Sequence, residues 1–162
     1  MNIGFFDIET TGFHPEKDEI LVVCIANNAT SRVKVIKKGK MTEEEVIREA
    51  LSSMSIYGSI VSWNGSSFDI PFLSRRAIKY GLRFNHKFHI DLMQKSARFI
   101  PNVEKSLDAM ASTLLIDTHP TEYNASIWKM AKRGDKDAMQ YIVDHCSSDV
   151  ITLKKVWKKL ME

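Results

Sequence analysis

The segment Asp7-Ile8-Glu9 constrains the fold more than any other part of this 162-residue chain. It follows an apolar run that is typical of a β-strand over residues 3–9. Successive side chains of a strand point to opposite faces, so we expect Asp7 and Glu9 on one face, about 7 Å apart along the chain. Neighbouring carboxylates repel each other unless a cation lies between them, and Mg²⁺ and Mn²⁺ prefer such oxygen ligands. Two solvated acids at an exposed strand end are the alternative interpretation.

The rest of the pattern predicts an α/β domain with a mixed sheet. Strands at 20–26 and 31–36 would complete an antiparallel meander with the first. A capping box, Thr42 to Glu45, predicts a helix to about residue 54, and a strand at 59–63 follows it in a parallel crossover. A fifth strand is expected at 87–90. Further helices are expected at 69–80, 91–98, 106–115 and 126–133, and from about 135 to the C-terminus, the last continuous or broken.

Composition favours a single domain over residues 1–162. Hydrophobic residues make up 44% and charged residues 27%, which indicates neither disorder nor a membrane protein. No apolar run approaches the roughly 20 residues of a membrane helix, and no basic N-terminal segment indicates a signal peptide. Cys24 and Cys146 lack zinc-ligand spacing, so we expect free, partly buried thiols in a reducing, cytoplasmic location.

The formal net charge of +3 is distributed unevenly. Each basic cluster alone is typical of a solvated surface, but together they fit a polyanionic ligand. The three clusters are Lys37, Lys38 and Lys40; Arg75, Arg76, Lys79 and Arg83; and Lys154, Lys155, Lys158 and Lys159.

Two further segments carry candidate site residues. Asp69 lies where a strand and loop lead into a helix, the edge of an α/β sheet at which ligands bind, although it could simply cap that helix. His145 and Asp149 are four residues apart, which places them on one face of a helix, although they could be an ordinary surface pair. Asp91 is interpreted first as a helix cap and second as a residue supporting the site. Trp128 is interpreted as a packing residue.

In this order, the segments resemble the motifs of the DEDD superfamily of 3′–5′ exonucleases, the DnaQ-like group of the ribonuclease H-like fold. Residues 7–12 resemble the first motif and 145–149 the third. Residues 64–73 are similar to the second motif as it occurs in proofreading domains of B-family DNA polymerases, and 106–111 to the helix that precedes the third. The resemblance implies a five-stranded mixed sheet, three antiparallel strands and then parallel ones, flanked by helices.

The resemblance also implies a function. The chain would hydrolyse phosphodiester bonds from the free 3′ end of single-stranded DNA or RNA and release 5′-mononucleotides. Two divalent ions, Mg²⁺ or Mn²⁺, would activate water and stabilise the leaving oxygen. The implied metal ligands are Asp7, Glu9, Asp69 and Asp149.

Other residues would complete the site. His145 would orient or deprotonate the attacking water, since imidazoles titrate near neutral pH. The backbone at Thr10 and Thr11 would meet the terminal nucleotide, with Asn64 and Phe68 beside it. Phe68 would stack on a base or else belong to the core.

Several alternatives stay open. His145 has the spacing at which one branch of the superfamily places tyrosine, and Tyr141 precedes it by one helical turn, so either residue could serve the water. An endonuclease acting on RNA or RNA–DNA hybrids and a non-catalytic nucleic-acid-binding module are the other functions considered. No membrane partner is expected, and a polymerase or helicase would act in trans.

Overall fold

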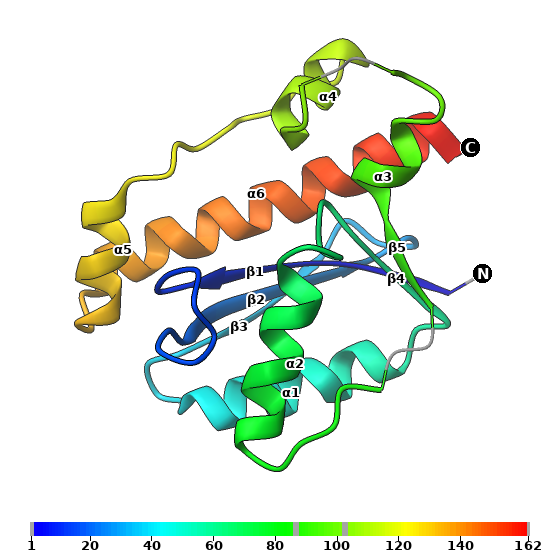
Figure 1. The fold of residues 1–162 in the computed structure, drawn as a ribbon. Coiled ribbons are helices and arrows are strands. Elements are labelled where there is room, and N and C mark those ends of the chain that lie inside the picture. The colour runs from blue at the N-terminus through cyan, green and yellow to red at the C-terminus, as the bar shows by residue number, and fades with distance from the viewer. Residues whose placement is uncertain (1, 86–87, 102–103, 162) are drawn as a thin grey trace.

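The computed structural model describes residues 2–85, 88–101 and 104–161. The strands of this part of the chain form one sheet in the order β3-β2-β1-β4-β5 (Figure 1). β1–β2 and β2–β3 are antiparallel, whereas β4 is parallel to β1 and β5 to β4, which confirms the predicted mixed sheet. The fifth strand begins at His89, and its predicted start at Lys87 lies outside the described residues. The bounds are β1 Ile3–Thr10, β2 Ile20–Asn27, β3 Val33–Lys37, β4 Ser59–Ser62 and β5 His89–Asp91.

Helices cover both faces of the sheet, α1 and α2 on one and α6 on the other, with α5 packed against the start of α6 (Figure 1). Side-chain caps begin several helices as predicted: the Thr42–Glu45 box for α1, Asp91 for α3 and Ser106 for α4. The C-terminal helix is unbroken. The bounds are α1 Glu43–Ser55, α2 Asp69–Lys79, α3 Leu92–Ser96, α4 Leu107–Thr113, α5 Ala125–Lys132 and α6 Lys136–Met161.

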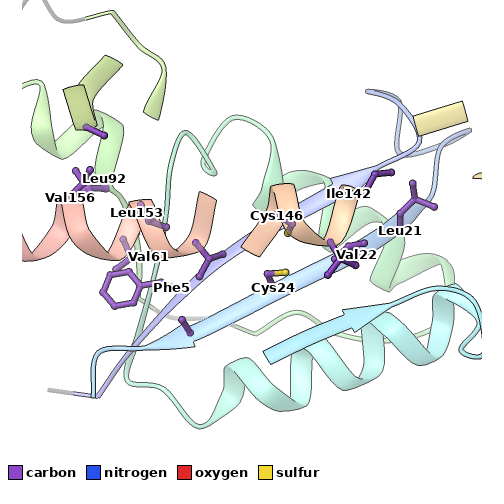
Figure 2. Packing of buried hydrophobic residues seen from close by; sticks show 14 of the residues in the cluster. Phe5, Leu21, Val22, Cys24, Val61, Leu92, Ile142, Cys146, Leu153 and Val156 are labelled. Carbon is purple, nitrogen blue, oxygen red and sulfur yellow. The ribbon is translucent and has the colours of Figure 1, made fainter. Parts of the chain in front are cut away.

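Alternation along β1 divides the core into two layers. Phe6 and Ile8 pack with α1 and α2 on one face of the sheet. Ile3 and Phe5 pack with α6 on the other face, where Figure 2 shows Phe5 near Leu153 and Val61. Because side chains two apart share a face, Asp7 and Glu9 continue the apolar stripe that faces α6. The first motif is therefore the polar end of a core strand.

Arg76 does not belong to a surface basic cluster, and this part of the prediction was wrong. The residue is 1% exposed, and its guanidinium forms a bidentate ion pair with Glu43 of α1. Arg76 Nη1 also donates to the Pro15 carbonyl at 2.9 Å, and the Tyr80 hydroxyl donates to Glu43 at 2.6 Å. The ion pair lowers the pKa of Glu43 despite burial. This network joins α1, α2 and the loop that follows β1.

Both cysteines are free, as predicted, but they are fully rather than partly buried. They lie between β2 and α6 (Figure 2). A hydrogen bond with the Cys146 thiol lowers the pKa of Cys24, whereas burial raises that of Cys146. Among the described helices, none combines the length and the apolar character needed to cross a membrane.

Candidate active site: a cleft lined by carboxylates

The three sequence motifs converge on one open cavity of about 390 Å³, here called the carboxylate cleft. β1, α2 and α6 each contribute acidic or imidazole side chains to it. The loop after β4 and the segment before α4 form its remaining walls. The lining residues are Asp7, Ile8, Trp63, Asn64, Phe68, Asp69, Lys105, Ser106, Leu107, Asp108, His145 and Asp149.

Asp69 does not cap α2, so the alternative interpretation of this residue as a helix cap was wrong. Phe68 occupies the N-cap position without a side-chain cap, and Asp69 is the first helical residue. Its carboxylate instead accepts a hydrogen bond from the Ile8 amide of β1 at 3.3 Å. The side chain, only 4% exposed, therefore reaches across to the strand that carries Asp7 and Glu9.

Glu9 and α6 meet at the other side of the cleft. The His145 ring nitrogen Nε2 lies 3.8 Å from Glu9 Oε1 and 3.7 Å from Asp149 Oδ2. One ligand atom each of Glu9, His145 and Asp149 lie within 4.8 Å of one another, as do those of Asp7, Glu9 and Cys146. Asp149 is the most open of these groups, with a third of its side chain exposed.

Tyr141 is turned to another partner. Its hydroxyl donates to the Glu122 carbonyl at 2.8 Å. His145, one helical turn later, is the aromatic side chain of this helix that lies against the carboxylates. The geometry thus favours His145 over Tyr141 for serving a water molecule in the cleft.

Crowding of the acids raises their pKa values. Burial is the main cause for Asp7 and Glu9, and the charges of Asp69 and Asp149 add to it, so both pKa values lie well above the usual range. Burial likewise raises the pKa of Asp69 to about 7 and that of Asp149 to about 6, where the nearby His145 opposes the rise. Such a cluster is costly when ionised and attracts positive charge.

Asp91 is a helix cap, as predicted, and it also holds the loop after β4. Its carboxylate caps α3 and also accepts hydrogen bonds from the amides of Asn64 and Ser66 at 3.1 and 3.0 Å. Asn64 adopts a left-handed conformation, with φ of 57°. A Cβ at Gly65 would lie 1.9 Å from the Ser62 hydroxyl, so only glycine fits there. This tight turn sets the position from which Phe68 and Asp69 enter the cleft.

A second cavity, of about 250 Å³, adjoins the carboxylate cleft at Ile8 and Phe68. Four aromatic side chains line it: Phe13, Phe68, Tyr123 and Trp128. Phe68 packs against Phe13 and Phe72, with ring centroids 6.0 and 5.4 Å apart, and stays partly exposed. It is therefore both part of the packing and available to a ligand.

The two threonines differ in position. Thr10 lines the second cavity, and its hydroxyl donates to the Gly12 carbonyl. Thr11 is used by the loop itself: its amide donates to the Glu19 carbonyl and its hydroxyl to Asp18. Substrate contact by the Thr11 amide would need that hydrogen bond to open.

Comparisons with known proteins agree with this architecture. A family model described as the RNase_H superfamily matches residues 4–161. The chain belongs to the RNase_H superfamily. The solved family B DNA polymerase of Pyrobaculum calidifontis matches 99% of the chain with a TM-score of 0.81 and 18% identity, which shows a shared fold. A DNA polymerase of Methanocaldococcus jannaschii is 30% identical over 91 residues, 49% of this chain.

These matches confirm the resemblance inferred from the motifs, and the chain has the nuclease fold of the RNase_H superfamily. The chain spans 24% of the Pyrobaculum polymerase and 6% of the Methanocaldococcus polymerase. The site contains groups of acidic side chains that could hold a metal ion.

The structure brings together all five predicted catalytic side chains and places Asn64 and Phe68 at the same cleft. Their roles stay predictions. Sequence patterns missed Thr121, whose hydroxyl lies 2.6 Å from His145 Nδ1, and assigned Trp128 to packing alone, although its indole N–H donates to Glu9 at 3.2 Å. Neither residue belongs to a recognisable motif, so no local signal marked them.

Proposed function

We propose that this protein is a metal-dependent 3′–5′ exonuclease that acts on single-stranded DNA or RNA. The observation that carries the proposal is the convergence of Asp7, Asp69, Asp149 and His145 on one open cleft, with Glu9 in the adjoining cavity 3.8 Å from His145. A folded protein gains nothing from gathering ionised carboxylates unless cations offset their repulsion. The oxygen donors suit Mg²⁺ or Mn²⁺.

The donor set fits two divalent ions held by the four carboxylates. When bound, such ions supply positive charge to the attacking and leaving oxygens of a phosphodiester. The raised carboxyl pKa values fit this use. Among the described residues, these carboxylates are not paired with lysine or arginine, so a bound cation would neutralise their charge. Asp149, the most exposed of the ligands, lies at the opening to solvent.

His145 is assigned to the attacking water. Nε2 faces the cleft between Glu9 and Asp149, while Nδ1 is turned toward Thr121. The nitrogen that faces the carboxylates can therefore orient a water and accept its proton.

The second cavity supports the proposal that the substrate is the end of a nucleic-acid strand. Its aromatic walls lie directly beside the carboxylates and offer stacking surfaces for one unpaired base, each such stack worth about 1–3 kcal/mol. Glu9, one of the proposed metal ligands, lines this cavity, so a base bound there would lie beside the carboxylates. The Methanocaldococcus relative is a DNA polymerase by name, and a polymerase or helicase acting in trans remains part of the proposal.

The proposal is tested by comparing Asp149→Asn with Asp144→Asn on a 5′-labelled single strand in Mn²⁺. Asp144 is exposed on the same helix and hydrogen-bonds Gln140, so its variant controls for altered helix charge. We expect Asp149→Asn to lose nearly all turnover and Asp144→Asn to keep it. Equal activity of the two variants would contradict the proposed site.

A circular single strand separates the two nuclease functions. An exonuclease needs an end and leaves the circle intact, whereas an endonuclease cuts it. Cleavage of a circle, made either of RNA or of an RNA–DNA hybrid, would show that the protein is an endonuclease rather than an exonuclease. Binding without cleavage of any substrate would leave a nucleic-acid-binding module.

A further inference from the structure

We propose that Thr121 and Trp128 are positioning residues, Thr121 for His145 and Trp128 for Glu9. The inference rests on the proposed function and adds two residues from outside the motifs. Both lie in the segment from Thr121 to the middle of α5, called here the positioning arm (residues 121–128). The arm contacts His145 through Thr121 and Glu9 through Trp128, and Tyr123 and Trp128 line the second cavity.

Thr121 acts on the histidine ring through one short contact. Its Oγ1 lies 2.6 Å from Nδ1, the nitrogen turned away from the carboxylates. Thr121 is half-buried, whereas the flanking residues 119–120 and 122–126 are exposed. A single hydrogen bond to Nδ1 is enough to fix the orientation of the imidazole ring, and here it leaves Nε2 facing the cleft. When Nδ1 carries the proton, Nδ1–H donates a hydrogen bond to the threonine oxygen, and unprotonated Nε2 is left free to receive a proton from water.

Trp128 acts on the carboxylate of Glu9. Its indole N–H donates to Oε2 at 3.2 Å, while Oε1 is the oxygen nearest to His145 Nε2. The indole is 4% exposed and packs against Tyr123, Tyr141 and the His145 ring, with centroids 4.8, 6.3 and 5.4 Å away. Because these contacts fix the indole, its hydrogen bond can hold Oε2 of Glu9 and leave Oε1 directed at His145.

The arm is also held independently of the Thr121 hydroxyl. The side chains of α6 donate to backbone carbonyls of the preceding loop: Tyr141 to Glu122, Ser148 to His119 and Lys155 to Asp117. These contacts would keep the loop in place when Thr121 is changed. Removing the hydroxyl therefore isolates its effect on His145.

The first test compares Thr121→Val, which keeps the shape but loses the hydroxyl, with Thr121→Ser, which keeps the hydroxyl. Loss of a supporting hydrogen bond of this kind costs about 10- to 100-fold in activity or metal affinity. We expect Thr121→Val to lower kcat by about that factor at saturating Mn²⁺, with the Mn²⁺ Kd from electron paramagnetic resonance unchanged, and Thr121→Ser to restore kcat. Asp144→Asn, the exposed control on the same helix, should keep wild-type kcat.

Trp128→Phe should give the complementary result. It keeps a packed aromatic ring but loses the N–H, so the Mn²⁺ Kd should rise about 10-fold. A role in packing alone would instead lower the melting temperature in EDTA without changing the Kd measured on the folded protein.

A double variant shows whether Thr121 acts through His145. In a His145→Ala background, Thr121→Val should have no further effect on the residual rate, because the group it positions is gone. A further loss of the same size would overturn the proposal, as would wild-type kcat in Thr121→Val alone.

One readout is independent of activity. In EDTA, the ring NMR signals of His145 should shift in Thr121→Val and stay near wild type in Thr121→Ser. Unchanged signals in Thr121→Val would refute the hydrogen bond itself. If the wild type cleaves no strand while these shifts occur, the proposed function fails and the positioning contact stands.

Discussion

Replacing Asp69 with asparagine should stabilise the metal-free protein at alkaline pH. Burial raises the pKa of this carboxyl from 3.8 to about 7. A carboxyl whose pKa is raised by folding destabilises the folded state as pH rises, because the unfolded chain releases the proton first. The penalty is absent below 3.8, grows between 3.8 and about 7, and is complete above about 7.

The size of this penalty follows from the two pKa values. At roughly 1.4 kcal/mol for each pH unit, the full cost is about 4 kcal/mol, and the part that develops between pH 5 and pH 8 is about 2–3 kcal/mol. Asparagine avoids the charge and keeps an oxygen that can accept from the Ile8 amide. Asp69→Asn should therefore gain about 2–3 kcal/mol over wild type between pH 5 and pH 8.

The assay is urea unfolding of wild type and Asp69→Asn in EDTA at both pH values. Asp144→Asn, at an exposed acid on α6, is the control and should show no such pH-dependent gain. An Asp69→Asn advantage that does not grow with pH, or a variant less stable than wild type at pH 8, would refute the electrostatic account of the cleft.

Three further predictions follow from the same structure. Mg²⁺ or Mn²⁺ at a hundredfold excess over its Kd should stabilise the wild type by about 2.7 kcal/mol, and thermal unfolding of Asp69→Asn should show much less of this rise. Arg76→Ala would leave Glu43 buried without its partner and should cost about 3–5 kcal/mol, measured by urea unfolding; a loss under 1 kcal/mol would contradict the buried pair. Gly65→Ala, whose Cβ would overlap Ser62, should destabilise by roughly 1–3 kcal/mol in the same assay. Gly39→Ala is the comparison: open space surrounds this residue, so only the strain of its positive φ should lower the stability.

Much of the fold was predictable because it depends on short-range periodicity. The alternation of β1 placed Asp7 and Glu9 on one face, and the i, i+4 spacing placed His145 and Asp149 together on α6. Helix caps were also recognised locally, as at Thr42. These features need only residues that are near one another in the sequence.

The features that were missed depend on contacts between distant segments. The sequence left open whether Asp69 caps its helix or faces the site, and the hydrogen bond from the Ile8 amide, 61 residues away, decides against the cap. Arg76 was predicted as a surface charge, but it forms a buried ion pair with Glu43 of α1. Thr121 and Trp128 have no periodic pattern that relates them to His145 and Glu9. Tertiary packing determines these hydrogen-bond and ion-pair partners, and no pattern of neighbouring residues in the sequence indicates them.

The most direct test of the central claim is a time course on 5′-labelled single-stranded DNA and RNA, in Mn²⁺ and in EDTA. The account predicts a ladder that shortens step by step from the 3′ end, in Mn²⁺ only, with 5′-mononucleotides as products. An intact strand in Mn²⁺, or cleavage that continues in EDTA, would contradict a carboxylate cleft that hydrolyses nucleic acid with divalent metal.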